Sequence, residues 1–407
     1  MRWVLFIGFF ILSWYSFQAI KTVFHSKPTQ FLYVGLVVLI YGSIFWFFFF
    51  DQRQNQMTPY RQYLIGLSMG LMIFQIVSVF FLFLEDIVRI FQATASFFSK
   101  GARVDEFFIP QRRVFISRTA LVAGALPFGT ILYGMFRGRY NYKVIRHTLE
   151  FDNLPEAFDG FTIAQISDLH TGSFINRDKV AYGFRLINQL SSDVIFFTGD
   201  LVNDRASEVD SYRDIFSSLK AKEGIYSVLG NHDYGDYTSW ESQAEKEQNF
   251  KQLIETHKDL GWTLLLNQSI VLNRNGQKIV IVGVENWGTG RFKRAGDLDQ
   301  ALKNVHPDDF KILLSHDPSH WEAKVLPHRN PVPLTLSGHT HGMQFGIEIP
   351  GVIKWSPASW RYKQWAGIYK EGNQYINVNR GFGYIAYPGR VGIYPEITHI
   401  TLIKKRD

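Results

Sequence analysis

The chain has 407 residues, of which 46% are hydrophobic, 16% aromatic and 19% charged, a composition that excludes a disordered or acidic tail protein. It contains no cysteine, which excludes disulfide scaffolds, thiolate nucleophiles and iron–sulfur clusters, so a metal would need His, Asp, Glu, Asn or backbone oxygen ligands. The formal charge of +7 is uneven: residues 1–150 hold 15 Lys or Arg against 6 Asp or Glu, and the remainder holds 28 against 30. Because the larger part is not basic, we expect no nucleic-acid partner.

Four uncharged apolar stretches lie in the first third of the chain. A membrane-spanning helix needs roughly 20 mostly apolar residues, and the two inner stretches meet this length easily, whereas the two outer stretches are near the lower limit. Buried helices of a soluble domain are the alternative. A transporter is disfavoured, because the stretches contain no Lys, Arg, Asp or Glu. We predict a transmembrane region over residues 1–146, in contact with the lipid bilayer of a bacterial cell membrane, with helices at about residues 3–20, 31–50, 62–84 and 119–136.

The orientation of this region is predicted from one local motif. Counting basic residues on the two sides of four crossings gives seven against eight, which decides nothing. Arg112 and Arg113, followed by Val114-Phe115-Ile116, resemble a twin-arginine export signal. An ordinary basic flank of a membrane helix is the alternative. The export interpretation places the C-terminal part of the chain on the extracytoplasmic side.

From about Phe151 onward, short apolar runs alternate with polar segments of helical period. This alternation predicts an α/β domain over residues 151–407, with a parallel or mixed sheet and helices on its faces. The expected helices are Arg177–Leu190, Val209–Ala221 and Ser239–Leu260. The expected strands are Phe161–Ile166, Val194–Phe197, Ile225–Leu229, Lys278–Val284, Lys311–Leu314 and Leu334–Leu336.

Five of these strands are followed directly by residues that can bind a metal. Each short motif is weak alone, since a single Gly-Asp is usually a turn and a single His-x-His usually arises by chance. Ligands in an open α/β sheet collect at the carboxyl ends of the strands, so we expect these side chains to meet at one edge of one sheet. Oxygen and imidazole ligands suit Zn, Mn or Fe. The residues are Asp168 and His170, then Asp200, then Asn231, His232 and Asp233, then His316, and finally His339 and His341.

This series of motifs resembles the calcineurin-like metallophosphoesterases, whose order is Asp-x-His, Gly-Asp, Gly-Asn-His-Asp, a single His and Gly-His-x-His. The resemblance covers about residues 151–402 and is strongest to the membrane-associated YkuE-like branch, through 338–342, 378–381 and 395–397. Met343 departs from that branch, which commonly has a glycine there. The resemblance implies a sandwich of mixed β-sheets flanked by helices, which the N-terminal bundle of transmembrane helices precedes.

The resemblance also implies a centre with two divalent ions (Mn, Fe, Zn or Mg) whose shared hydroxide attacks phosphorus. His232 would donate a proton or hydrogen bond to the leaving oxygen, and Asp233 would orient the His232 ring. Arg380 would contact the substrate phosphate, with a structural loop arginine as the alternative. Asp168, His170 and His341 would hold one ion, Asn231, His316 and His339 the other, and Asp200 both.

The expected function is therefore a membrane-anchored phosphoesterase, whether phosphodiesterase, phosphatase or pyrophosphatase. Kinship alone suggests a lipid-linked phosphoester substrate such as UDP-2,3-diacylglucosamine, and hence a place in lipid metabolism. Nucleotide-activated precursors are cytoplasmic, so this substrate and the export interpretation point to different compartments. A catalytically inactive membrane scaffold or receptor is the alternative. We expect His320 and His328 to lie on the surface, and Trp355–Tyr369 to form a β-hairpin region rather than a lipid-facing groove.

Overall fold

The computed structural model describes residues 2–50, 58–98, 110–349 and 351–406. It contains two compact units, Met1–Phe136 and Arg137–Asp407, each described here by itself.

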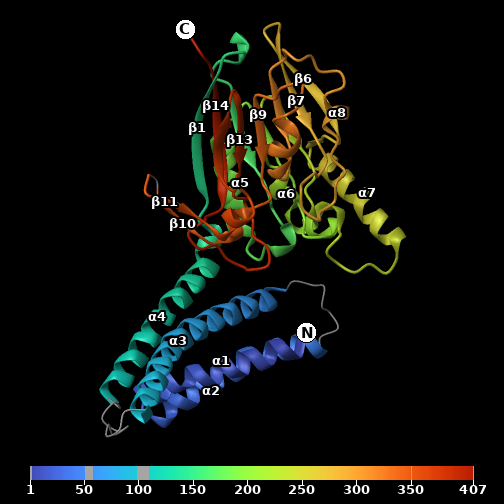
Figure 1. The fold of residues 1–407 in the computed structure, drawn as a ribbon. Coiled ribbons are helices and arrows are strands. Elements are labelled where there is room, and N and C mark those ends of the chain that lie inside the picture. Colours follow the sequence, from blue (N-terminus) through green and yellow to red (C-terminus); the bar gives the residue numbers. More distant parts are fainter. Residues whose placement is uncertain (1, 51–57, 99–109, 350, 407) are drawn as a thin grey trace. The chain divides into compact units, whose positions relative to one another are not determined.

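The first unit consists of four long apolar helices, which confirms the predicted transmembrane helices (Figure 1). Each helix is longer than its apolar stretch. Side chains such as Phe10, Phe31 and Leu39 are more than half exposed on the helix surfaces, as expected where lipid is the solvent. The helices are α1 (Arg2–Val23), α2 (Lys27–Phe50), α3 (Pro59–Phe98) and α4 (Pro110–Phe136).

Helices α3 and α4 pack closely because small residues face large ones. A Cβ added at Gly124 would lie 2.7 Å from the carbonyl oxygen of Phe74, so only glycine allows this approach of the two backbones. The 40 residues of α3 extend about 60 Å, roughly twice the hydrocarbon thickness of a bilayer. Helix α3 is therefore longer than a single crossing of the hydrocarbon layer requires.

Charged side chains link the helices just past the apolar stretch 62–84. Arg113 Nη1 lies 2.5 Å from Glu85 Oε2 and 2.9 Å from Asp86 Oδ1, and Arg112 Nη2 lies 3.5 Å from Glu85 Oε1. The Tyr15 hydroxyl of α1 donates to Asp86. The two arginines of the export-like motif are thus part of helix α4 and pair with acidic residues of α3.

The second unit contains two six-stranded sheets and a separate hairpin. The first sheet has the order β1-β14-β2-β3-β4-β5, and the second has the order β12-β13-β9-β8-β7-β6. In the first sheet, the members are β1 (Lys143–Phe151), β2 (Thr162–Ile166), β3 (Val194–Phe197), β4 (Ile225–Ser227), β5 (Thr263–Leu264) and β14 (Glu396–Lys404). In the second, they are β6 (Gln268–Arg274), β7 (Gln277–Gly283), β8 (Lys311–Leu314), β9 (Leu334–Ser337), β12 (Gly367–Glu371) and β13 (Gln374–Val378).

Strand β1 was not predicted from the sequence. It pairs in parallel with β14, from Lys143 opposite Glu396 to Phe151 opposite Lys404, so the ends of the second unit lie side by side in its first sheet. Strand β2 runs antiparallel to β14, and β3, β4 and β5 then continue parallel to β2.

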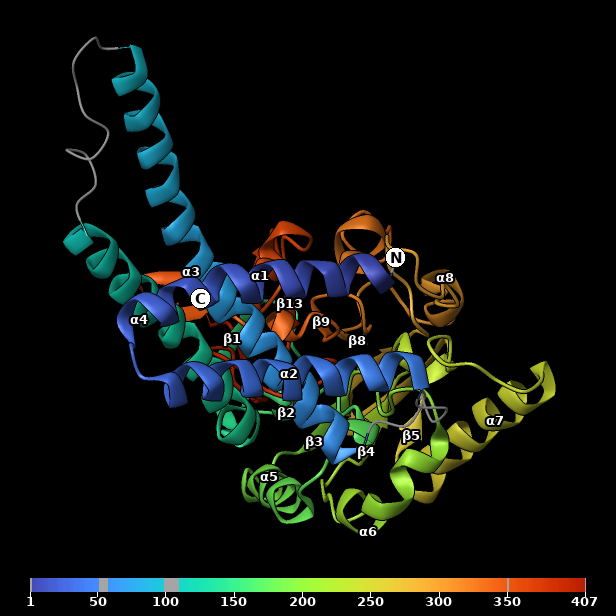
Figure 2. The same cartoon turned by 90° about the horizontal axis from the view of Figure 1, so that it is seen from below.

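The alternation of side chains along each strand builds the layers of this unit. Along β3, Val194 and Phe196 point into the core between the sheets, whereas Ile195 and Phe197 face the helices. Figure 2 shows the resulting layers, with α5, α6 and α7 on one side of β2–β5 and α8 beyond the second sheet. This arrangement confirms the expected sandwich of mixed sheets flanked by helices. The helices are α5 (Arg177–Gln189), α6 (Arg213–Phe216), α7 (Gln243–Asp259) and α8 (Leu298–Ala301).

The predicted helix Val209–Ala221 is mostly absent as an α-helix. A 3-10 segment, Ala206–Tyr212, precedes the single turn α6. Ser217 and Ser218 donate their hydroxyls back to the carbonyls of Arg213 and Ile215. Such side-chain bonds compete with helix continuation, which explains why the helix ends early.

Candidate metal centre

The ligand candidates lie at the carboxyl ends of strands, but these strands belong to two sheets. β2, β3 and β4 of the first sheet lead to Asp168, Asp200 and Asn231, whereas β8 and β9 of the second lead to His316 and His339. The expectation of one edge of a single sheet was wrong. The hydrogen bond from Gly338 N to His316 O and the two from His339 N to the Asp168 carboxylate bring the two sheet edges together.

Left-handed backbone conformations aim the side chains inward. Positive φ occurs at Asp168 (54°), His170 (48°), Asp200 (60°), His339 (71°) and His341 (50°). Such conformations cost roughly 1–3 kcal/mol each in non-glycine residues and cluster at functional sites. Five of them among the predicted ligands indicate that the turns hold a required geometry.

The side chains form two adjoining groups. The first group is Asp168, His170 and His341. The Nε2 atoms of His170 and His341 lie 3.0 Å apart, and His341 Nε2 lies 3.2 Å from Asp168 Oδ1. The second group is Asp200, His316 and His339: His316 Nε2 lies 3.1 Å from Asp200 Oδ2 and 3.3 Å from His339 Nδ1. Each group presents three potential ligand atoms within 4.8 Å of one another.

Asp200 lies between the groups. Its Oδ2 is 3.1 Å from His316 Nε2 in one group and 3.5 Å from His170 Nε2 in the other. Its Oδ1 accepts a hydrogen bond of 2.8 Å from the backbone N–H of His232. This bond orients the carboxylate, so that Oδ2 faces both sets of imidazoles.

Asn231 fits a ligand role through an orphaned atom. Its side-chain nitrogen donates to the Tyr237 hydroxyl at 2.9 Å, whereas its Oδ1 is buried and accepts no hydrogen bond among the described residues. A buried acceptor without a donor is costly, and a cation would satisfy it. The donor set of imidazole, carboxylate and amide oxygen fits divalent Mn, Fe or Zn.

Burial and opposite charges set the protonation of these groups. Burial lowers the pKa of His170, His339 and His341, which favours the neutral imidazole that binds metals. Burial acts on His316 in the same direction, but Asp200 outweighs it and raises the His316 pKa to about 10. The surrounding imidazoles hold the pKa of Asp200 well below its usual range despite burial, so its carboxylate is ionised.

His232 lies beside the groups, and its ring has a different partner from the expected one. The ring is half-buried and lies 4.9 Å from that of His170. His232 Nδ1 is 2.9 Å from the carbonyl oxygen of Asn203, which fixes Nδ1 as a donor and leaves Nε2 for another contact.

Asp233 does not orient the His232 ring, and the expectation that it would was wrong. Its two carboxylate oxygens instead accept hydrogen bonds from four backbone N–H groups, at 2.8 to 3.3 Å. Asp233 therefore fixes the turns that carry Asp200 and Asn231. The donors belong to Asp200, Leu201, Val202 and Gly230.

Arg380 is held by carboxylates, as the structural alternative predicted. Its Nη1 lies 2.5 Å from Glu396 Oε2 and its Nη2 lies 2.6 Å from Glu348 Oε1. Arg380 of the 378–381 motif thus binds Glu396 of the 395–397 motif, and Asn379 donates to the neighbouring Thr398 at 2.9 Å. Each terminal nitrogen thus gives one hydrogen bond to a carboxylate, which favours the structural role, and a contact between Arg380 and substrate stays a prediction.

Three further residues contact the imidazoles and were not predicted. Arg390 is fully buried, and its Nη2 lies 3.0 Å from His341 Nδ1. The Tyr362 hydroxyl lies 2.7 Å and Asp317 Oδ2 lies 3.5 Å from His339 Nε2. Such partners orient metal-binding imidazoles. A hint existed only for Asp317, which follows His316 in the sequence.

Two secondary expectations change. His320 is buried rather than on the surface, and its Nδ1 lies 2.8 Å from the Ser315 hydroxyl. Residues 355–369 do not form one hairpin: they comprise the end of β11 (Ile353–Trp355), a 3-10 turn at Pro357–Trp360 and the start of β12. The segment reaches the metal centre through Tyr362.

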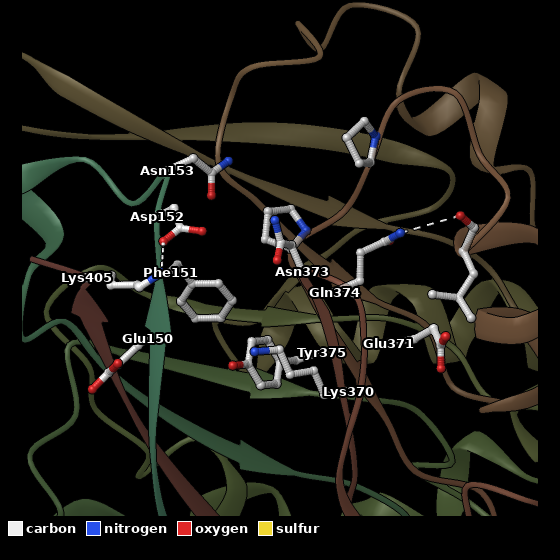
Figure 3. Close-up of a pocket in the computed structure, with 14 residues that line it drawn as sticks. Glu150, Phe151, Asp152, Asn153, Lys370, Glu371, Asn373, Gln374, Tyr375 and Lys405 are labelled. Carbon is white, nitrogen blue, oxygen red and sulfur yellow. Dashed lines mark hydrogen bonds and ion pairs between the residues drawn. The ribbon is translucent and has the colours of Figure 1, made fainter. Parts of the chain in front are cut away.

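A pocket of about 740 Å³ lies elsewhere (Figure 3). It is lined by the end of β1 and by the turn between β12 and β13, which belong to the opposite end of the sheets from the ligands. Lys405 and Asp152 form an ion pair there at 3.0 Å. None of the ligand candidates lines this pocket.

Comparison with known proteins gives matches over both units. Residues 161–343 match the family model of the calcineurin-like phosphoesterases, and residues 1–139 match that of a probable calcineurin-like phosphoesterase transmembrane domain. The metallophosphoesterase YkuE of Bacillus subtilis is 31% identical, over 70% of this chain and 93% of its own length.

Two further bacterial relatives match. A metallophosphoesterase of Helicobacter pylori is 25% identical, over 98% of this chain and 96% of its own. The phosphodiesterase YaeI of Escherichia coli is 28% identical, over 72% of this chain and all of its own.

Proposed function

Since the chain belongs to the calcineurin-like metallophosphoesterases and is thus a metal-dependent phosphoester hydrolase with membrane helices, we propose that it hydrolyses a lipid-linked phosphoester or pyrophosphate with two divalent ions. The observation that carries the proposal is Asp200, whose Oδ2 faces His170 on one side and His316 on the other.

The residues that would hold the ions follow from the two groups. Asp168, His170 and His341 would bind one ion, and His316 and His339, with Asn231 Oδ1, would bind the other. Asp200 would contact both. Divalent ions at such a centre supply a more acidic water and neutralise charge on phosphoryl oxygens.

The chain's own residues would protonate the leaving oxygen and hold the metal-binding imidazoles in orientation. The bond from His232 Nδ1 to the Asn203 carbonyl leaves Nε2 to face the leaving oxygen, to which it would donate a proton from the imidazolium form of the ring. Tyr362 and Asp317 hold His339 in orientation, and Arg390 does so for His341. The complete ligand set argues against the inactive-scaffold alternative.

A substrate screen tests this function. The purified full chain in lipid nanodiscs is stripped of metal with a chelator, reloaded with Mn²⁺, and assayed on bis(p-nitrophenyl) phosphate and UDP-2,3-diacylglucosamine. We expect metal-dependent hydrolysis of both, with the higher kcat/KM on the lipid. The name of the YaeI relative supports a phosphodiester substrate. Hydrolysis of the simple diester alone would exclude the lipid-linked class, and hydrolysis of neither by metal-loaded protein would favour the scaffold alternative.

We also propose that the protein lies in a bacterial cell membrane with its phosphoesterase unit on the extracytoplasmic side. The Arg112-Arg113 motif supports this orientation. Because four crossings are an even number, the start of α1 and this unit lie on the same side in this topology. The chain lacks cysteine, so single cysteines at Tyr182 and Val271, both exposed in the second unit, can be labelled in intact cells with an impermeant maleimide. Labelling only after lysis would place the unit in the cytoplasm.

A further inference from the structure

The hairpin of β10 (Ile347–Ile349) and β11 (Ile353–Trp355) belongs to neither six-stranded sheet. Its apolar side chains face outward, and polar side chains between them face inward. Its strands pair antiparallel, and Figure 1 shows them beside the lower ends of β1 and β14. We define the apolar strip as the six large hydrophobic residues in and before the hairpin, which are 39% to 78% exposed. These residues are Met343, Phe345, Ile347, Ile349, Val352 and Ile353.

The polar residues that alternate with the strip point inward. Gln344 donates to the carbonyls of Ile385 and Tyr387 at 3.0 and 2.8 Å, and Glu348 accepts from Arg380 at 2.6 Å. An ordinary surface strand has the opposite pattern, with its polar side chains outside. Because the inward polar side chains have specific hydrogen-bond partners, the strand cannot turn over. The alternating apolar side chains are therefore held facing outward. Contiguous exposed apolar residues of this kind mark an interaction surface.

The strip begins at the metal centre. His341 and Met343 belong to the same 3-10 turn, His341–Gln344, in which Met343 has φ of 48°. At the other side of the hairpin, Trp360 is 79% exposed, and its ring lies 6.0 Å from that of Trp355. Exposed Arg361 follows Trp360. Tryptophan and arginine beside aliphatic residues are typical of segments that lie in the interface of a bilayer.

The chain also connects the strip to the membrane helices. Helix α4 ends at Phe136, and two residues later the backbone of Gly138 touches Arg390: an added Cβ would lie 2.0 Å from the Arg390 carbonyl oxygen. Val391, the next residue, pairs with Phe345 of the strip. Two residues span about 7 Å at most. Only Arg137 therefore separates the last residue of α4 from Gly138, which touches the segment paired with the strip.

We propose that the apolar strip inserts into the interface of the same bilayer that the N-terminal helices span, as a second membrane contact made by the phosphoesterase unit. A bilayer suits the strip because its outward side chains are apolar without carboxylates, and because the chain connects its unit directly to a membrane helix at Arg137. The contact does not depend on hydrolysis. Its consequence, which rests on the proposed function, is that His341 and its neighbours face the headgroup layer, where lipid-linked phosphates lie.

Spin labels test the proposal in the full chain. Single cysteines at Ile347, Ile349 or Val352 carry a nitroxide in nanodiscs of phosphatidylcholine and phosphatidylglycerol, and collisions with oxygen and with a water-soluble nickel chelate are measured. Oxygen partitions into lipid and the chelate stays in water. We expect collisions with oxygen to dominate over collisions with the nickel chelate at these three sites. Control labels at Tyr182 and Val271, about as exposed as Ile347, should stay nickel-dominated.

Two further arms keep the result decisive. The variant I347S/F345S with a label at Val352 should lose the oxygen-dominated signal, while its control label at Val271 is unchanged. Nickel-dominated collisions at all strip positions would overturn the proposal. Spectral broadening that disappears on dilution with unlabelled protein would also overturn it, because the strip would then be covered by a second copy of the chain.

Discussion

At the scale of single residues, the turns that follow the strands decide which side chains reach the two ligand groups. Asp-x-His and Gly-His-x-His after apolar runs identified Asp168, His170 and His341, because residues directly after strands are confined to turns at a sheet edge. The role of Asp233 was missed because it shares a 3-10 turn with His232, so that neighbours in sequence point to different places. Arg390 lies 49 residues from His341, and nothing in the sequence links the two.

His232 is expected to act on turnover without holding metal. The change His232→Ala removes the proton donor and should lower kcat by roughly 10²–10⁴-fold. Metal content, measured by mass spectrometry, should stay at the wild-type value, because the His232 ring lies outside both ligand groups. A variant that loses metal would show that His232 is itself a ligand. His306→Ala, on the exposed surface, serves as the matched control.

Asp233 is expected to act on stability. Asp233→Ala leaves four backbone N–H groups without their acceptor, and a buried donor left without an acceptor costs roughly 1–3 kcal/mol. The melting temperature of the second unit should fall, together with metal binding, in circular dichroism and metal analysis. Asp236→Ala, at an exposed position three residues on, is the control. An unchanged melting temperature would refute the turn-fixing role.

At the scale of elements, the type of secondary structure was easier to predict than which strands pair with one another. The expected strands were largely found, because buried runs such as Val194–Phe197 are apolar and bounded by polar turns. Strand β1 has the sequence KVIRHTLEF, in which charged residues interrupt the apolar ones directly after a membrane helix. For this reason it was not predicted as a strand. The division into two sheets was also hidden, since hydrogen bonding between β7 and β8 and the absence of such pairing between β5 and β6 leave no trace in hydropathy.

The packing of α7 on β4 predicts a response to acid. His257, in the last turn of α7, is fully buried beside Ser227, and burial lowers its pKa to about 3. Between about pH 6.5 and pH 3 the unfolded chain binds a proton that the folded chain does not, so stability falls as the pH falls. The variant H257Q keeps a hydrogen-bonding side chain without titrating. Its melting temperature should decline less steeply between pH 6.5 and pH 5 than that of the wild type, and equal slopes would contradict this.

The charged link between α3 and α4 predicts a non-additive pair of substitutions. Arg113→Leu removes the closest cation of Glu85, which is nearly buried, while Arg112 and Arg89 remain within 4 Å, so the helical unit should lose roughly 1.5–3 kcal/mol of stability. The double variant R113L/E85L should recover most of this loss, because the carboxylate that lost its partner is also removed. Unfolding in mixed detergent micelles measures both. Additive losses would show that the pair does not act as a unit.

At the scale of the whole molecule, four membrane helices and a phosphoesterase sandwich are joined at Arg137. Composition alone placed the basic excess and the apolar stretches in the first third, because lipid selects residues by polarity over lengths of about 20 residues. The convergence of side chains from β2, β3, β4, β8 and β9 required the fold, since these strands span residues 162–337 and lie in two sheets. The separate hairpin with its outward apolar strip was not foreseen at all.

The most direct measurement of the central claim is the metal stoichiometry of the purified full chain and of its Asp200→Ala variant. Mass spectrometry should find two divalent ions per wild-type chain, and at most one in the variant, whose hydrolysis of bis(p-nitrophenyl) phosphate should disappear. A wild-type chain that binds fewer than two ions at saturating metal, or a variant that keeps full metal content and an unchanged rate, would contradict a shared two-metal centre around Asp200.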